Sequence, residues 1–220
     1  MIKWFEDFAK CEEIMKMGIW VSGGTDSALA LYLACKALVD NNATHKSIVA
    51  MHGYDTRRTC AYSPDAFRKI LYYMREDYPN VNMAEYILPY MKKDGEEKRK
   101  YHRPLHDWLR IENVIDFSCL AMTRSEWDDA PDDRNRMWAE EEPFSHVTRG
   151  YASPMKHMTK RDVAKYYLDS STLQKIFPHT ASCVSMKKSP CKKCWWCKEK
   201  AWAFNAYDGD EIDLDHINTY

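Results

Sequence analysis

The sequence predicts an α/β fold built on a parallel sheet, followed by a small metal-binding segment. Two observations indicate this arrangement. Short apolar runs alternate with helix-forming stretches through the first 120 residues, which is the pattern of parallel strands joined by right-handed helical crossovers. Four cysteines then lie within residues 183–197, a density typical of a bound metal ion. We therefore expect one large domain over residues 1–180 and a short segment over residues 181–220 that packs on it.

Length and composition narrow the classes of protein to consider. A chain of 220 residues with 45% hydrophobic residues suits one domain with a small appendage and a well-buried core. Its formal net charge of −1 argues against a protein that binds nucleic acid stably, which is usually basic. No apolar run approaches the length of a membrane span, and the acidic, aromatic N-terminus is unlike a signal peptide. We expect a cytoplasmic protein with no membrane contact.

Hydrophobic spacing locates the individual elements. The first helix is indicated by Trp4, Phe5 and Phe8 at near-helical spacing. A cap residue, a proline and an acid at 63–65 predict the start of another helix, and the charged run 92–100 suits a solvated loop or a helix start. We expect helices at residues 1–17, 28–36, 66–78 and 102–112, and strands at residues 18–21, 47–51, 81–88 and 113–119.

The turn between the first strand and the next helix is the most informative stretch. It reads Ser22-Gly23-Gly24-Thr25-Asp26-Ser27. Its glycines allow a ligand to approach the backbone, and the following helix presents N–H groups and a positive dipole end that suit phosphate. Ser27 is placed to contact a phosphate oxygen. Asp26 would repel phosphates without a cation, so it indicates a magnesium ligand. The alternative is an ordinary strand–helix corner with a capping side chain.

Two further positions could contribute to such a site. Ligands of parallel sheets bind at the carboxyl ends of the strands, so Met51 and His52, at the end of the second strand, are candidates for an adenine pocket. A hydrogen-bonded loop histidine is the alternative for His52. Thr159 predicts a helix cap, which places Lys160 in the first turn, where a cation opposes the helix dipole. A phosphate partner would explain this lysine, and simple solvation is the alternative.

Residues 123–150 are polar, with little hydrophobic period, and follow the fourth strand. A long irregular loop beside a ligand site is often functional, so we expect it to form the substrate loop. A surface excursion without function is the alternative.

The cysteines near the C-terminus predict a metal site. Four thiolates at this spacing suit a tetrahedral zinc ion, and because all four positions are taken by protein, the zinc should be structural. Core thiols or an iron–sulfur cluster are the alternatives. The expected ligands are Cys183, Cys191, Cys194 and Cys197. The remaining four read as core thiols: Cys11, Cys35, Cys60 and Cys119.

The motif Ser-Gly-Gly-x-Asp-Ser at residues 22–27 resembles the PP-loop of ATP pyrophosphatases, and it lacks the lysine of a Walker loop. Together with Cys-x7-Cys-x2-Cys-x2-Cys at 183–197, it resembles the 7-cyano-7-deazaguanine synthase family of queuosine biosynthesis. The stretch Pro154 to Lys160 and the strand end at Phe117-Ser118 are similar to segments of that family. The resemblance implies a Rossmann-like, adenine nucleotide α-hydrolase-like fold. It also implies an ATP-dependent ligase that adenylates a deazapurine carboxylate, admits ammonia, and releases AMP and pyrophosphate.

The expected site residues combine this resemblance with the strand-end and helix-start positions described above. Catalysis would fall to Asp26, Ser27 and Lys160. Magnesium-bound ATP would be held by Val21, Ser22, Gly23, Gly24, Thr25, Asp26, Ser27, Met51 and His52. A homodimer is one oligomeric state to consider.

The chain departs from this family on the substrate side. Residues 51–58 replace an Asp-Tyr-Gly-Gln-Arg-His-like stretch, Ser118-Cys119-Leu120 stands near a Gly-x-Asn, and the 123–150 loop lacks a Tyr-Pro-Asp-Cys-Arg-like sequence. The acceptor therefore stays open between a deazapurine and another carboxylate. A PP-loop enzyme that adenylates or sulfurates a tRNA base is a second hypothesis, and a non-catalytic zinc-bearing binding module is a third.

Overall fold

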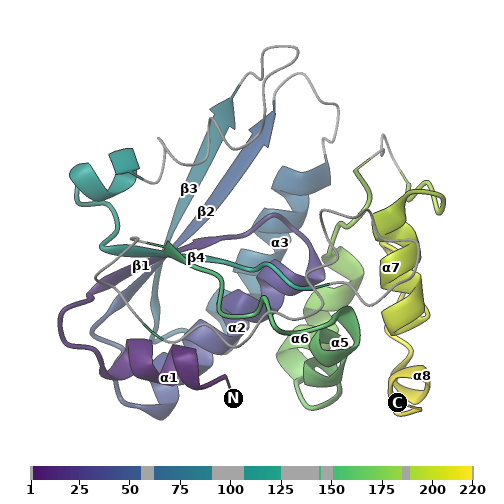
Figure 1. The fold of residues 1–220 in the computed structure, drawn as a ribbon, viewed down its shortest axis with the longest axis horizontal. Helices are drawn as coiled ribbons and strands as arrows, with labels where there is room; N and C mark the ends of the chain where they lie inside the picture. Colours follow the sequence, from purple (N-terminus) through teal and green to yellow (C-terminus); the bar gives the residue numbers. More distant parts are fainter. Residues whose placement is uncertain are drawn as a thin grey trace.

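The computed structural model describes residues 2–55, 62–90, 107–124, 144, 151–184 and 189–219. In these ranges the predicted α/β fold is confirmed. Five parallel strands form one sheet in the order β3-β2-β1-β4-β5 (Figure 1). The central strand β1 pairs with β2 on one side and with β4 on the other, so the chain first builds one half of the sheet and then returns to build the second half.

The strands are β1 (Lys16–Trp20), β2 (Ser47–Asp55), β3 (Asn82–Tyr90), β4 (Phe117–Leu120) and β5 (Tyr151–Ala152). The helices before β5 are α1 (Lys3–Lys10), α2 (Thr25–Asp40), α3 (Tyr62–Asp77) and a short helix over 107–111. Those after β5 are α5 (Lys160–Leu168), α6 (Ser171–Ile176), the 3-10 helix η2 (Phe177–His179), α7 (Trp195–Phe204) and α8 (Leu214–Ile217). None of the described helices is long and apolar enough to cross a bilayer.

The N-terminal helix is shorter than the 1–17 range that the sequence predicts. It ends at Lys10 because Lys46, which is 2% exposed, donates to the carbonyl of Phe8 at 2.9 Å and to that of Cys11. The Asp116 carboxylate then accepts the backbone N–H groups of Met15 and Lys16, each at 2.8 Å. These distant partners end the helix and direct the chain into β1.

Other boundaries also differ from the sequence-based expectation. The second strand continues past residue 51 to Asp55 because β3 pairs with it along its whole length. The fourth strand begins at Phe117 and not at 113, since Asn113 has a positive φ of 55° in a turn. Helix α3 begins at Tyr62, just before the predicted cap. The short strand β5 was not predicted. The charged run 92–100 and residues 102–106 lie outside the described residues.

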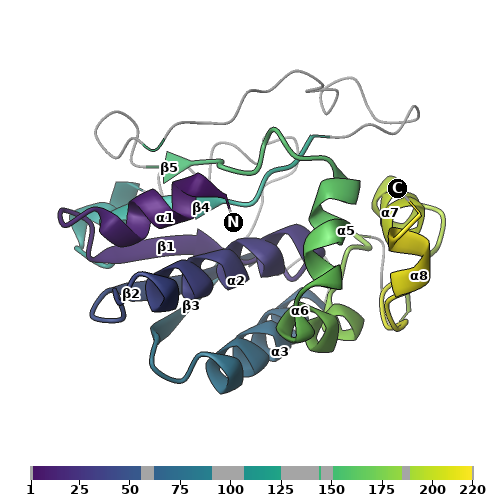
Figure 2. The same cartoon turned by 90° about the horizontal axis from the view of Figure 1, so that it is seen from below.

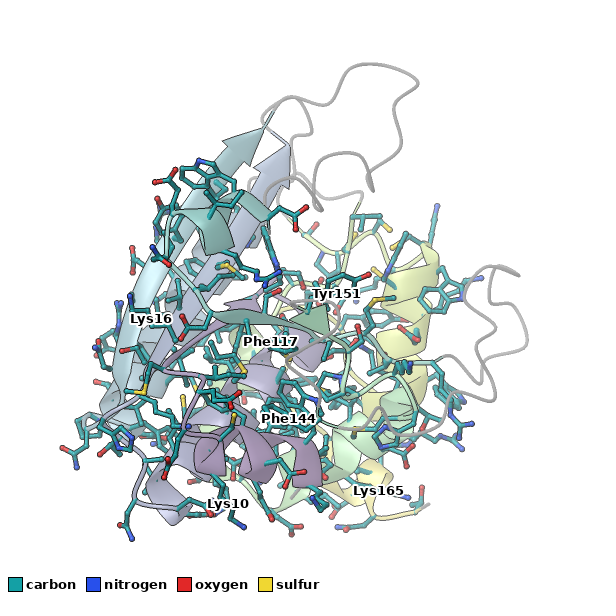
Figure 3. The ribbon with its side chains drawn as sticks, turned by 60° about the vertical axis from the view of Figure 1, so that its left-hand side comes forward. Lys10, Lys16, Phe117, Phe144, Tyr151 and Lys165 are labelled. Carbon is teal, nitrogen blue, oxygen red and sulfur yellow. The ribbon has the colours of Figure 1, made fainter. Side chains whose placement is uncertain are left out.

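Helix α2 is the centre of the core. Eleven of its residues are buried, and it contacts α1, α3, α5, α6 and the sheet. Figure 2 shows α5 and α6 standing between α2 and the C-terminal tail, which comprises residues 180–219. Beside α1, Phe144 packs on Trp4 with ring centroids 5.2 Å apart, and Phe117 lies 6.4 Å from Phe144 (Figure 3).

The tail joins the same hydrophobic core. Phe204 of α7 packs on Tyr167 of α5 and on Phe177 of η2, with ring centroids 5.3 Å and 4.9 Å apart. All three side chains are fully buried. The tail is therefore anchored by apolar packing as well as by its cysteines.

Candidate nucleotide and metal sites

The turn that follows β1, residues 21–24, lies where the two halves of the sheet diverge. From β1 the chain runs to β2 and β3 on one side, and later returns to β4 on the other. In open parallel sheets, the carboxyl ends of strands at such a switch point form the ligand crevice. The fold thus places residues 21–27, which we call the phosphate loop, at the expected edge.

The start of the phosphate loop is fixed by β2. The N–H of Val21 donates to the carbonyl of Met51 at 2.8 Å, and the carbonyl of Val21 lies 2.7 Å from Nδ1 of His52. Because a carbonyl only accepts, Nδ1 of His52 carries the proton. Burial lowers the pKa of the His52 imidazole, which stacks on Phe67. His52 is therefore a neutral donor that holds the loop.

Hydroxyl groups line the turn itself. Ser22 Oγ and Ser27 Oγ are 3.2 Å apart, Ser27 Oγ donates to the carbonyl of Gly24 at 2.9 Å, and Gly23 has a φ of 95°, which favours glycine. Gly24 occupies the N-cap of α2 and supplies no side-chain cap. The first turn of this 16-residue helix is thus left without a capping side chain, as suits an anion site.

Asp26 and Lys160 form the charged centre of the site. Lys160 Nζ lies 2.5 Å from Asp26 Oδ1, although α2 and α5 are far apart in sequence. Thr123, beyond β4, donates to Asp26 Oδ2 at 3.2 Å. Glu199 of α7 approaches Lys160 Nζ to 3.9 Å, and the Lys160 side chain is only 7% exposed. Four separate parts of the chain therefore meet at one ion pair.

The predicted position of Lys160 is confirmed at the level of secondary structure. Thr159 caps α5 and accepts from the N–H of Asp162, whose carboxylate accepts in return from the Thr159 backbone. Lys160 follows as the first residue of the helix. No sequence pattern pointed to Glu199 or to Thr123 as individual site residues, because their roles depend on tertiary contacts.

Met51 and His52 lie within β2 and not at its end. Their side chains are 0% and 1% exposed. Met51 packs in a cluster with Trp20 and Leu109. An adenine ring could reach these two side chains only after neighbouring residues moved, so their role in an adenine pocket stays a prediction. Of the expected substrate loop, only Thr123, Arg124 and Phe144 lie among the described residues.

The four C-terminal cysteines come together as predicted. Their Sγ atoms all lie within 4.8 Å of one another, with 3.9 Å between Cys194 and Cys183 and 4.0 Å between Cys191 and Cys197. A tetrahedral ion with Zn–S bonds of about 2.3 Å separates its sulfurs by about 3.8 Å. The side chains therefore fit one tetrahedral ion. A four-iron cluster would spread its thiolates farther apart, since each binds a different iron.

Local backbone geometry forms this four-cysteine knuckle. Lys192 has a φ of 55°, which turns the chain between Cys191 and Cys194. The N–H of Cys194 then points at Cys191 Sγ, 3.3 Å away. Backbone N–H groups lower the pKa of the Cys191 thiol to about 6, whereas burial raises the pKa of Cys197. An array of N–H groups that favours thiolate is what a cationic metal site requires.

The other cysteines match their predicted role in part. Cys35 and Cys119 are fully buried, and Cys11 is partly buried. Burial raises the pKa of the Cys35 thiol. Cys60 lies outside the described residues.

No protein-family profile and no curated protein sequence matches this chain. Among solved structures, the NH3-dependent NAD synthetase from Campylobacter jejuni is similar, with 12% identity, a TM-score of 0.44, and coverage of 76% of this chain and 68% of that chain. The U34-tRNA thiolase NcsA from Methanococcus maripaludis, with its [4Fe-4S] cluster, is similar at 15% identity and a TM-score of 0.39. The match covers 56% of this chain and 46% of the thiolase. Both similarities are distant.

Proposed function

We propose that this protein is an ATP-dependent enzyme that cleaves ATP between the α and β phosphates and transfers AMP to an acceptor. One observation carries the proposal: the Asp26–Lys160 ion pair stands beside the hydroxyl-lined turn at the start of α2, at the switch point of the sheet. The turn carries no Walker lysine. Lys160 instead reaches the site from α5 and can supply positive charge to the phosphates.

The charges at the site suit a magnesium complex of ATP. Magnesium binds through one or two carboxylates together with phosphate oxygens and water. Asp26, with the hydroxyls of Thr123 and Ser27 nearby, offers such oxygens. With MgATP bound, Asp26 would hold the magnesium ion and Lys160 would pair with a phosphate oxygen. The two positive charges would stabilise the negative charge that develops on the departing pyrophosphate.

The acceptor is the finer part of the proposal. The phosphate loop and the four-cysteine knuckle occur here in the combination that resembles the 7-cyano-7-deazaguanine synthases. The first acceptor to test is therefore 7-carboxy-7-deazaguanine. Its carboxylate would attack the α-phosphorus of ATP and displace pyrophosphate. Ammonia would then displace AMP from the adenylate and form the amide, which precedes the nitrile. No nucleophilic protein residue is needed, because alignment of the two reactants supplies much of the rate.

The test combines nucleotide and product analysis. The protein is incubated with ATP, magnesium, ammonium and 7-carboxy-7-deazaguanine, and in parallel with tRNA in place of the deazapurine. We expect AMP and pyrophosphate with the carboxylate, and loss of both in Asp26→Ala. Asp40→Ala is the matched control, because Asp40 ends the same helix in an exposed pair with Lys36. ADP and phosphate as products would overturn the α–β cleavage. Release of AMP only with tRNA would reassign the acceptor to RNA, and binding of ATP without turnover would indicate a non-catalytic module.

A further inference from the structure

The phosphate loop and the four-cysteine knuckle are joined by residues 180–183, which we call the bridge segment. The N–H of Ala181 donates to the carbonyl of Gly23 at 2.7 Å. The carbonyl of Ala181 faces Gly24, since a Cβ placed there would lie 3.7 Å from it. Two residues later, Cys183 contributes its sulfur to the knuckle. Only one residue therefore separates the contact with the phosphate loop from a metal ligand.

A buried ion pair holds the bridge segment in place. Asp208 Oδ2 accepts the N–H groups of Ser182 and Cys183, each at 2.8 Å. Asp208 Oδ1 accepts from Lys200 Nζ at 2.9 Å, and Lys200 Nζ also donates to Thr180 Oγ1 at 2.8 Å. The Lys200 and Asp208 side chains are 0% and 1% exposed. Every residue of the bridge segment is thus held by a hydrogen bond to the phosphate loop or to this pair.

Helix α7 adds a second connection. It carries the metal ligand Cys197 in its first turn, and then Glu199 and Lys200. Glu199 lies 3.9 Å from Lys160, the partner of Asp26, while Lys200 supports the bridge segment. A bound ion would fix the first turn of α7 through Cys194 and Cys197, and with it the position of both following side chains.

We infer that the four-cysteine site positions the phosphate loop, so that metal occupancy and ATP binding are coupled through Ala181 and the Lys200–Asp208 pair. The inference rests on the proposed ATP site. Ala181, Lys200 and Asp208 are positioning residues, since they act through Gly23 and the bridge segment. Four-thiolate sites fold with their metal, so loss of the ion releases Cys183 and loosens the segment attached to it.

The decisive variant is Ala181→Pro. It removes the N–H that donates to Gly23 and leaves the four cysteines and the Lys200–Asp208 pair intact. The preceding residue, Thr180, has φ −78° and ψ 141°, the extended conformation that proline requires before it. We expect this variant to retain its metal and its melting temperature, and to bind MgATP about tenfold more weakly, within the usual range of couplings between sites. Asp215→Asn, an exposed aspartate of the same tail, is the control with unchanged affinity.

Metal removal provides the second arm. Calorimetry measures MgATP affinity before and after chelation of the wild-type protein, and again after zinc is restored. We expect the wild type to bind MgATP more weakly without metal and to regain its affinity when zinc is restored. Ala181→Pro already lacks the connecting hydrogen bond, so its affinity for MgATP should fall little further when its metal is removed. Because coupling is reciprocal, MgATP should also slow extraction of the metal from the wild type more than from Ala181→Pro. If chelation unfolds the chain, the affinity of metal-loaded Ala181→Pro for MgATP still tests the inference.

Hydrogen exchange of the backbone at 22–28 separates failure of this inference from failure of the proposed function. Faster exchange there after metal loss, in a wild type that binds no MgATP, would support positioning of the phosphate loop by the four-cysteine site and would overturn the ATP site. The opposite outcome is that the metal-free protein and Ala181→Pro both bind MgATP as tightly as the metal-loaded wild type and exchange at the same rate. That result would overturn the coupling and would leave the ATP site supported.

Discussion

At the scale of single residues, the site depends on one lysine that water scarcely reaches. Lys160 is 5% exposed and lies between Asp26 and Glu199. A buried charge that loses its partner is strongly destabilising, whereas replacement of both partners by apolar groups can be nearly neutral. Stability and the proposed catalysis therefore place different requirements on this pair.

The Asp26–Lys160 pair allows these two demands to be separated. Asp26→Ala should lower the free energy of unfolding by about 3 kcal/mol, because Lys160 loses its nearest carboxylate and keeps only Glu199, 3.9 Å away. The same change should abolish turnover, because the magnesium ion of MgATP would lose a ligand. The double variant Asp26→Ala/Lys160→Met should recover only part of that stability, because Glu199 then loses Lys160 as a partner, and it should recover none of the activity. Urea unfolding and AMP release measure the two properties. Recovery of activity in the double variant would show that neither charge takes part in the reaction.

His52 should make stability depend on pH. Burial, with a smaller effect of Arg68, lowers its pKa below the ordinary value of 6.5. The folded state thus keeps His52 neutral while the unfolded state takes up a proton, so this contribution is present above pH 6.5 and is lost as the pH falls toward the folded-state pKa.

His52→Asn can keep a donor to Val21 and removes the titration. The melting temperature of the wild type should therefore fall more steeply than that of the variant between about pH 7 and pH 5, the range in which histidines charge. His45→Asn, at an exposed position, serves as the control with a wild-type slope. Parallel curves for the wild type and His52→Asn would contradict a neutral, buried imidazole.

At the scale of elements, α5 connects a capping motif to the site. Thr159 caps this helix, and the next residue is Lys160. Ser170 caps α6 by accepting the N–H of Leu173 at 3.2 Å, but α6 carries none of the candidate site residues. The two helices thus have similar caps, but only the cap of α5 precedes a candidate site residue.

Thr159→Ala and Ser170→Ala should each lower the free energy of unfolding by about 1 kcal/mol, the usual cost of a lost N-cap. Only Thr159→Ala should also lower kcat/KM, because its helix start orients Lys160. Denaturant titration paired with steady-state kinetics distinguishes the two effects. An equal loss of kcat/KM in both variants would show that activity simply follows stability.

The elements that the sequence predicted well are those with local causes. The turn between β1 and α2 carries glycines and hydroxyls that are visible in its own sequence, and the start of α5 carries its own cap. The end of α1 depends on Lys46 and Asp116, which lie far along the chain. The four C-terminal cysteines lie close together in the sequence, so their spacing alone was enough to group them into one site. Glu199 could not be placed beside Lys160 without the packing of α7 on α5.

At the scale of the whole molecule, the tail shares one core and one polar network with the sheet domain. Phe204 packs on Tyr167, and the Lys200–Asp208 pair is as buried as the apolar core around it. Loss of a metal ion from the knuckle should therefore also lower the stability of the sheet domain.

Cys194→Ser should remove the metal and lower the melting temperature, because a closed four-thiolate site contributes directly to folding. Elemental analysis should give one zinc ion per chain in the wild type, as a single tetrahedral site holds one ion. Val184→Ser, an exposed position next to a ligand, is the control that should keep both metal and melting temperature. Iron with a visible absorption band would identify a cluster instead, and full zinc in Cys194→Ser would place the ligands elsewhere.

The contact between Ala181 and Gly23 also has a consequence for synthesis of the chain. A ribosome makes the phosphate loop early, together with β1 and α2, but makes its support from the bridge segment more than 150 residues later. Because strand β1 also needs β4 as a neighbour, the nucleotide site cannot be completed while the chain is still short. A nascent chain that stopped before Cys183 would contain the whole glycine motif but would lack the complete bridge segment that supports it. The proposed ATP site can therefore be completed only after residues 180–183 have been synthesised.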